Sequence, residues 1–148
     1  MVSILEVIEY ASKMHEGQYD RDNKPYILHP LSVGMMGENY NEKVVGILHD
    51  IMEDCNVSVD DLRLIGVSEE CLDALVLLTH KKSEMGYFEY VQRVIESHNL
   101  LALKVKHNDL VHNFRRGKKY PDLQKKHGKA LQMIENALQQ IQSEKKSW

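Results

Sequence analysis

Hydrophobic positions recur at helical spacing along most of this chain. Between residues 2 and 16, apolar side chains return every three or four positions, which is the period of one helix face. The same spacing predicts further helices over residues 30–39, 42–53, 87–97, 100–114 and 121–143, with shorter ones after the N-cap candidates Ser58 and Ser68. We detect no segment with the two-residue alternation that is typical of half-buried strands. The pattern therefore predicts an all-α fold.

The expected architecture is a compact helical bundle that forms a single domain over residues 1–148. Residues 17–28 are rich in Gly, Asp, Asn and Pro, so we expect a loop between the first two helices. Residues 139–148 include a polar end, and we expect them to form a frayed tail.

The run GILHDIMED combines four polar side chains with a predicted helix. Residues four apart share one stripe of a helix, so His49 would lie above Glu53, and Asp50 above Asp54. The upper pair offers an imidazole nitrogen and a carboxylate oxygen to a divalent cation, and the lower pair can orient or deprotonate a water. A solvated polar face with a chance HD dipeptide is the alternative interpretation.

Two other strings supply further potential ligands. In PYILHP, Pro30 favours the first helical position, so His29 would lie in extended backbone just outside the helix. In VKHNDLVHN, Asp109 and Asn113 share one stripe of a predicted helix. A surface His and an Asp paired with a nearby Lys are the ordinary alternatives. Together, two His and two Asp could share one cation, and this oxygen-rich set favours a catalytic metal with open positions over a closed structural zinc site.

The ordered strings HxGQ, PYxxHP, LHDxxED and KxxDxxxN, found between His15 and Arg115, resemble the HD-type phosphohydrolases. They are most similar to the Rel/Spo-type alarmone hydrolases and their small stand-alone relatives. The resemblance implies release of pyrophosphate from the 3′ position of ppGpp with a divalent metal ion, typically Mn²⁺, with Zn, Fe, Ni or Co as alternatives. It implies the metal ligands His29, His49, Asp50 and Asp109, the water-assisting pair Glu53 and Asp54, and the substrate contacts Arg21, Lys106, Asn113 and Arg115.

One position departs from the family pattern. Asp20 occupies the place of a family Arg that stacks on guanine, while Arg21 matches the next basic position. An Asp can neither stack as a cation nor offer donors to a base. Either Tyr19 or Arg21 takes over this contact, or the base is not guanine. Two alternatives therefore stay open, which are an HD-type nucleotidase or phosphatase for another nucleotide and a non-catalytic nucleotide-sensing module.

Composition narrows the possible partners and location. The net charge is −3, but residues 104–129 carry nine Lys or Arg against two Asp, a balance that would attract a phosphorylated nucleotide. We expect no nucleic-acid partner, because no binding module is recognisable.

No apolar run reaches the ~20 residues of a membrane span, and no signal peptide is recognisable, so we expect no membrane partner. Two isolated cysteines, Cys55 and Cys71, fit a reducing cytoplasm. The oligomeric state stays open.

The remaining histidines receive minor roles. His15 belongs to the HxGQ string, and we expect it to pack behind the site or support it. For five others we predict surface positions or local hydrogen bonds; these are His80, His98, His107, His112 and His127.

Overall fold

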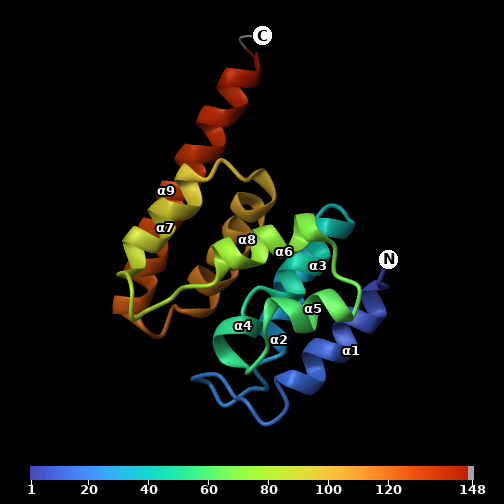
Figure 1. The fold of residues 1–148 in the computed structure, drawn as a ribbon. Coiled ribbons are helices and arrows are strands. Elements are labelled where there is room, and N and C mark those ends of the chain that lie inside the picture. Colours follow the sequence, from blue (N-terminus) through green and yellow to red (C-terminus); the bar gives the residue numbers. More distant parts are fainter. Residues whose placement is uncertain (147–148) are drawn as a thin grey trace.

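The computed structural model of the chain describes residues 1–146 and confirms the all-α prediction (Figure 1). The helices are α1 (Ile4–Met14), α2 (Leu28–Met36), α3 (Tyr40–Leu48), α4 (Ile51–Asp54), α5 (Val59–Leu64), α6 (Glu69–Leu78), α7 (Tyr87–Glu96), α8 (Leu100–Arg116) and α9 (Pro121–Lys146). Within residues 1–146, none of these helices has both the length and the apolar content that crossing a bilayer requires.

Helix α3 is the centre of the core and contacts α1, α2, α6 and α8. Its apolar side chains, including Val45, Ile47 and Leu48, are fully buried. Helices α2 and α3 approach closely where Gly34 meets Gly46. A Cβ on Gly46 would lie only 2.9 Å from the Gly34 Cα, so the approach requires a residue without a side chain. This close packing brings the beginning of α2 next to the end of α3.

Helix α8 connects this core to an outer pair of helices. It packs against α2, α3 and α6 on one side and against α9 on the other, and α7 lies beside α9 (Figure 1). The beginning of α2, the end of α3 and the middle of α8 therefore meet inside the molecule.

Polar N-caps define where several helices begin. The Ser58 side chain accepts from the Asp61 N–H while Asp61 accepts from the Ser58 N–H, which forms a capping box. Ser68 caps α6 by accepting from the Cys71 N–H. Both predicted N-caps are therefore confirmed.

The predicted helix over residues 42–53 is wrong in its continuity. Helix α3 ends at Leu48, the chain turns at His49 and Asp50, and the short α4 follows. The Nδ1 atom of His49 lies 2.6 Å from the Gly46 carbonyl oxygen, the acceptor that the Asp50 N–H would need in a continuing helix. The imidazole thus replaces a helical hydrogen bond at the HD dipeptide.

Two other boundaries differ from the prediction. His29 lies inside the first turn of α2, which begins at Leu28, because Pro30 occupies a position whose N–H has no partner within the helix. The frayed tail is wrong for residues 139–146, which continue α9. Residues 147–148 of that predicted tail lie outside the described part of the chain.

Candidate metal centre and substrate pockets

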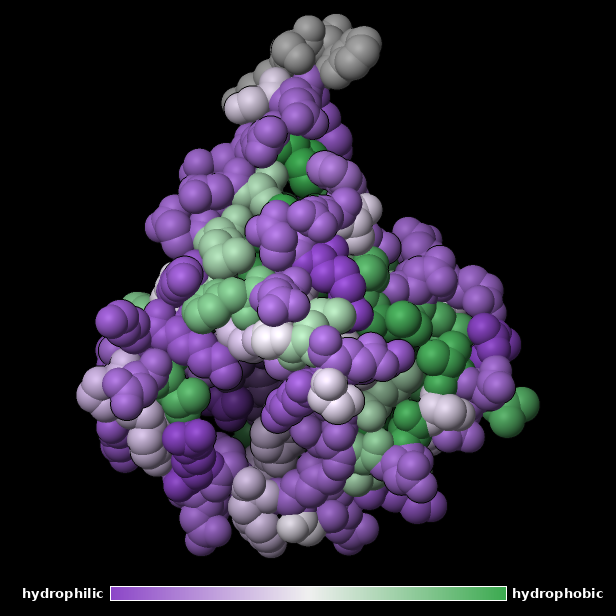
Figure 2. Space-filling model, turned by 60° about the vertical axis from the view of Figure 1, so that its left-hand side comes forward, coloured by the Kyte–Doolittle hydropathy of each residue, from purple (hydrophilic) through white to green (hydrophobic). Residues whose placement is uncertain are grey.

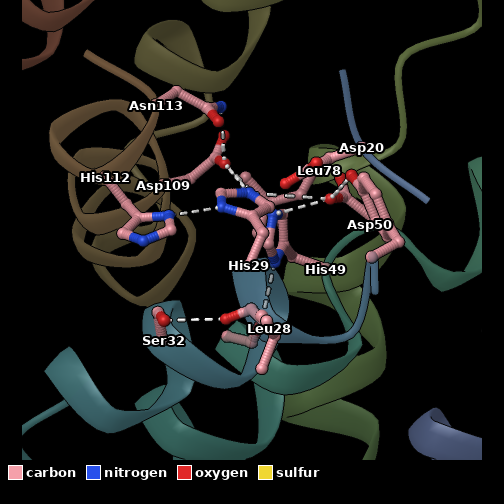
Figure 3. Close-up of polar contacts among 12 residues, drawn as sticks. Asp20, Leu28, His29, Ser32, His49, Asp50, Leu78, Asp109, His112 and Asn113 are labelled. Carbon is pink, nitrogen blue, oxygen red and sulfur yellow. Dashed lines mark hydrogen bonds and ion pairs between the residues drawn. The ribbon is translucent and has the colours of Figure 1, made fainter. Parts of the chain in front are cut away.

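The four predicted ligand residues converge where α2, the HD turn and α8 meet (Figure 3). The Asp109 Oδ1 atom lies 2.8 Å from His29 Nε2 and 3.1 Å from His49 Nε2. The Asp50 Oδ2 atom lies 3.1 Å from His49 Nε2 and 3.8 Å from His29 Nε2. His29, His49 and Asp109 are buried, with 2%, 4% and 4% of their surface exposed. Three segments far apart in sequence thus supply one compact cluster.

The donor set fits a divalent cation. Ligand atoms about 2.1 Å from one ion, and at right angles to each other, lie about 3 Å apart, which matches the separations in this cluster. The donor atoms of His29, His49 and Asp50 all lie within 4.8 Å of one another. Two neighbouring carboxylates in a buried site are unfavourable unless positive charge compensates them. Both the geometry and the charge therefore suit a metal ion.

Outer hydrogen bonds orient both imidazoles. The Gly46 carbonyl can only accept, so the His49 Nδ1–H donates to it, and a metal ion would replace the proton that His49 Nε2 shares with the Asp50 and Asp109 carboxylates. The His29 Nδ1 atom lies 2.7 Å from Nδ1 of His112, whose pKa is lowered to about 4 by burial and by His29 itself. A neutral His112 can accept from His29, which leaves the His29 Nε2 lone pair for a cation. His112, for which the sequence indicated only a local bond, therefore supports a metal ligand.

The two carboxylates are held in their charged form. Burial opposes charge on Asp109, yet Lys106, whose Nζ lies 3.0 Å from Oδ2, and His49 keep the Asp109 pKa well below its usual range. Burial likewise opposes charge on Asp50, and His49 lowers the Asp50 pKa. The Tyr26 hydroxyl donates to Asp50 Oδ2 at 2.6 Å. Tyr26 belongs to the PYxxHP string, but its contact with Asp50 depends on the fold and could not be derived from the string.

Glu53 lies at the rim of a pocket of about 400 Å³ in front of this cluster. Its Oε1 accepts from the His80 backbone N–H, and partial burial raises the Glu53 pKa to about 7. Asp54 does not line this pocket; its backbone carbonyl accepts from the Gln18 amide, and burial raises its carboxyl pKa. The structure therefore brings Glu53, but not Asp54, to the pocket wall.

The metal pocket also has a basic wall, which is lined by lysine and histidine side chains. Lys82, Lys126 and His127 line it, and the Lys126 Nζ lies 4.1 Å from the centre of the Tyr87 ring. The His127 pKa is lowered to about 4 by burial, and its Nδ1 has no hydrogen-bond partner among residues 1–146. The basic composition of residues 104–129 signalled such a surface around Lys126, but Lys82 lies outside that stretch. His127 was expected only at the surface or in a local hydrogen bond.

A second pocket of about 430 Å³ adjoins the first and shares Tyr26, Lys82, Asn113 and His127 with it. Its other walls come from the loop after α1 and from the α8–α9 turn, and include Tyr19, Asp20, Arg21, Asp22, Arg116 and Tyr120. Figure 2 shows a hollow, at the lower left of the view, that hydrophilic residues surround. The two pockets together form a continuous polar site.

The predicted substrate contacts occupy different places. Asn113 lines both pockets, and Arg21 lines the second, where its guanidinium lies 5.5 Å from the Tyr120 ring. Lys106 lines the metal pocket but is buried and paired with Asp109. Arg115 is exposed and lines neither pocket, whereas its neighbour Arg116 lines the second.

The HxGQ string fastens the loop that carries part of the second pocket. The Nδ1 atom of buried His15 lies 2.8 Å from Gln18 Oε1, and the Gln18 amide donates to the Asp54 carbonyl at 3.0 Å. The His15 ring also packs against Tyr26, with 5.2 Å between ring centres. The string thus connects α1, the loop and α4 behind the metal centre.

No family model matches the sequence. Among curated proteins, the chain is 34% identical over 64 residues to a guanosine-3′,5′-bis(diphosphate) 3′-pyrophosphohydrolase of Borreliella burgdorferi, covering 40% of the chain and 10% of that protein. A probable enzyme of the same name from Mycoplasma pneumoniae is 31% identical over 104 residues, 68% of the chain and 14% of the relative. A GTP pyrophosphokinase of Streptomyces antibioticus is 28% identical over 144 residues, 89% of the chain and 17% of the relative.

The chain thus spans 10–17% of the length of these three relatives. The fold matches the solved structure of a metazoan ortholog of SpoT, with a TM-score of 0.69 and 21% identity over 96% of this chain and 94% of the other. The sequence relatives and the shared fold confirm the resemblance first indicated by the ordered motifs, and the chain is related to the Rel/Spo-type HD hydrolases.

Proposed function

We propose that this chain is a metal-dependent phosphohydrolase that releases pyrophosphate from the 3′ position of ppGpp. The observation that carries the proposal is the convergence of two imidazoles and two carboxylates at 2.8–3.8 Å, beside a pocket with a basic wall. The names of the Borreliella and Mycoplasma relatives support the reaction, and the structurally similar metazoan protein is described as hydrolysing ppGpp.

His29, His49, Asp50 and Asp109 would hold the metal ion, for which we propose Mn²⁺, with Zn, Fe, Ni or Co as alternatives. When bound, such an ion acts as a Lewis acid, which polarises a phosphoryl oxygen and lowers the pKa of a water molecule. The protein contributes the orientation of the ligands through Gly46, His112, Lys106 and Tyr26.

Glu53 is the general base of the proposed reaction. A carboxylate whose pKa is about 7 can accept a proton from water near neutral pH and can later return it. The water oxygen forms a bond to the phosphorus next to the ribose 3′ oxygen, and the bond between that phosphorus and the 3′ oxygen breaks. The 3′ oxygen takes a proton, and pyrophosphate leaves. A part for Asp54 in this step stays a prediction.

The basic wall is suited to the phosphates of the substrate. Lys82 and Lys126 offer ammonium donors in the pocket that the candidate metal ligands also line, and His127 offers an unpartnered ring nitrogen. The ion pair with Asp109 supports a role for Lys106 in holding this carboxylate, and its contact with the substrate stays a prediction. Contacts from Arg21 and Arg115 to the substrate stay predictions, as does a cytoplasmic location.

The direct test is pyrophosphate release from ppGpp by the purified protein with Mn²⁺. We expect release that EDTA stops and that Asp109→Asn abolishes, because the substitution removes a charged ligand while keeping its shape. A folded, Mn²⁺-loaded protein that leaves ppGpp intact would contradict the proposal.

The same assay distinguishes the alternatives. Asp20 at the position of the stacking Arg favours a second candidate, an HD-type nucleotidase or phosphatase for another nucleotide. Cleavage of ordinary 5′-nucleotides with ppGpp left intact would establish that candidate. Binding of nucleotides without cleavage of any of them would establish a nucleotide-sensing module.

A further inference from the structure

The polar stripe of α8 continues beyond the metal centre into the second pocket. Asp109, Asn113 and Arg116 are spaced four and three residues apart, so their side chains emerge on one face of the helix. At about 100° per residue, Arg115 emerges about 120° away from Asp109, which agrees with its exposed position. The helix therefore directs Arg116, and not Arg115, toward the substrate site.

Hydrogen bonds along this stripe hold the Arg116 guanidinium in place. The Asn113 amide nitrogen donates to Asp109 Oδ1 at 3.1 Å, and the Arg116 Nε–H donates to Asn113 Oδ1 at 2.9 Å. The Arg116 Nη1 lies 3.8 Å from Asp20 Oδ2, and 31% of the Arg116 side chain is exposed. One edge of the planar group is thus fixed, while part of the side chain remains open to the pocket.

Asp20 is built to hold this arginine. Its Oδ1 accepts from the backbone N–H groups of Asp22 and Lys24, each at 2.9 Å, which fixes the loop. Its Oδ2 is directed to Arg116 from the other side of the pocket. The acid at the family's stacking-Arg position is therefore paired with an arginine from α8.

The two pockets differ in the part of a nucleotide that they suit. The metal pocket carries Lys82 and Lys126, whose ammonium groups attract phosphates, and His127, whose unpartnered ring nitrogen can form a hydrogen bond. The second pocket carries the aromatic rings of Tyr19 and Tyr120 and the guanidinium planes of Arg21 and Arg116, which are groups that stack on bases. Its acids Asp20 and Asp22 offset part of the positive charge of the two arginines. Because the pockets are continuous, one nucleotide can place its phosphates in the first and its base in the second.

We propose that Arg116 binds the face of the substrate base in the second pocket, supplying from α8 the cation that is missing at Asp20, and that Asp20 is its positioning residue. This inference rests on the proposed function in taking a nucleotide as the substrate. It adds Arg116 to Tyr19 and Arg21, the two residues that the sequence offered for this contact, and all three line the second pocket.

The test compares two probes by calorimetry with Mn²⁺ present: GDP, which has a base and cannot release a 3′-pyrophosphate, and ribose 5-phosphate, which has no base. We expect Arg116→Ala to weaken GDP binding about tenfold, the scale of one lost stacking contact, with ribose 5-phosphate binding unchanged. Arg116→Lys should bind GDP as weakly as Arg116→Ala, because an ammonium has no planar face. Asp20→Asn should give a smaller loss of about threefold, because an exposed ion pair contributes little.

Lys118→Ala is the matched control, since Lys118 is exposed, carries the same charge, lies two residues away and lines neither pocket. The proposal is overturned if Arg116→Ala binds GDP like the unmodified protein, if Arg116→Lys restores binding, or if ribose 5-phosphate binding falls equally. A larger loss from Arg115→Ala than from Arg116→Ala also overturns it. Failure of the proposed reaction would instead appear as intact ppGpp, with the GDP measurements still deciding the role of Arg116.

Discussion

The metal centre and the second pocket adjoin each other but are built differently. The candidate metal ligands His29, His49 and Asp109 are 2–4% exposed and come from α2, from the turn that ends α3 and from α8. The second pocket is formed by a loop and by the end of α8, and its central cation, Arg116, has 31% of its side chain exposed. The proposed reaction site thus lies on buried elements, while the proposed base-recognition pocket lies on a surface that can vary without disturbing the core.

Loss of the general base should give the largest effect and should be confined to the chemical step. We expect Glu53→Gln to lower kcat by about 10²- to 10⁴-fold, with Mn²⁺ affinity and GDP affinity retained. Steady-state kinetics together with calorimetry would check this. Equal losses in metal binding would show instead that Glu53 belongs to the metal centre.

The pH dependence gives a second view of Glu53. Its carboxyl pKa is raised to about 7, so it is protonated and unable to accept a proton at lower pH, and kcat should rise as the pH increases through this range. A bound cation favours the carboxylate and should move the midpoint below 7. The rising limb should be absent from a kcat–pH profile of Glu53→Gln; its persistence there would assign the limb to another group.

The free energy of unfolding should respond more strongly to a substitution beside the candidate metal centre than to one in the second pocket. Lys106 is buried and paired with Asp109, so Lys106→Met leaves a buried carboxylate without its cation and should cost about 3 kcal/mol of unfolding free energy. Arg116→Met breaks a partly exposed pair and should cost less than about 1 kcal/mol. Urea unfolding in EDTA measures both. Equal losses would contradict the contrast between a rigid centre and a tolerant pocket.

A smaller effect is expected behind the metal ligands. His112→Phe removes the acceptor for His29 Nδ1 and should weaken Mn²⁺ binding about tenfold, while His112→Asn retains an acceptor and should recover part of the affinity. His107→Phe is the matched control, because His107 lies on the same helix and faces Glu135 instead. If His107→Phe weakens binding as much, His112 has no specific positioning role.

The sequence predicted which four side chains converge, because the signals for this candidate metal centre are local and ordered. His29 before Pro30, the HD dipeptide and the Asp109–Asn113 spacing could each be read within one segment, and the family resemblance joined them. The HD turn could not be predicted, because apolar periodicity continues through it and the interruption depends on the His49 ring reaching the Gly46 carbonyl. The local sequence pattern therefore predicted the candidate ligand residues but not the backbone turn that orients His49 and Asp50.

The second pocket was harder to predict because its contacts join distant segments. Arg115 and Arg116 are chemically identical neighbours, and helix phase together with the partner Asp20, 96 positions earlier in the numbering, decides between them. Likewise His112 and His127 gain their positions from tertiary packing. Side chains whose role depends on a partner across the fold carry no signal in their own segment.

The most direct test of the account is a calorimetric titration of the metal-free protein with Mn²⁺. We expect one Mn²⁺ to bind per chain, and its affinity should rise with pH because the ligands must lose protons. Asp50→Asn and Asp109→Asn should each bind Mn²⁺ at least about a hundredfold more weakly. Absence of Mn²⁺ binding, or unchanged affinity in both variants, would contradict the claim that these carboxylates and the two imidazoles hold one cation.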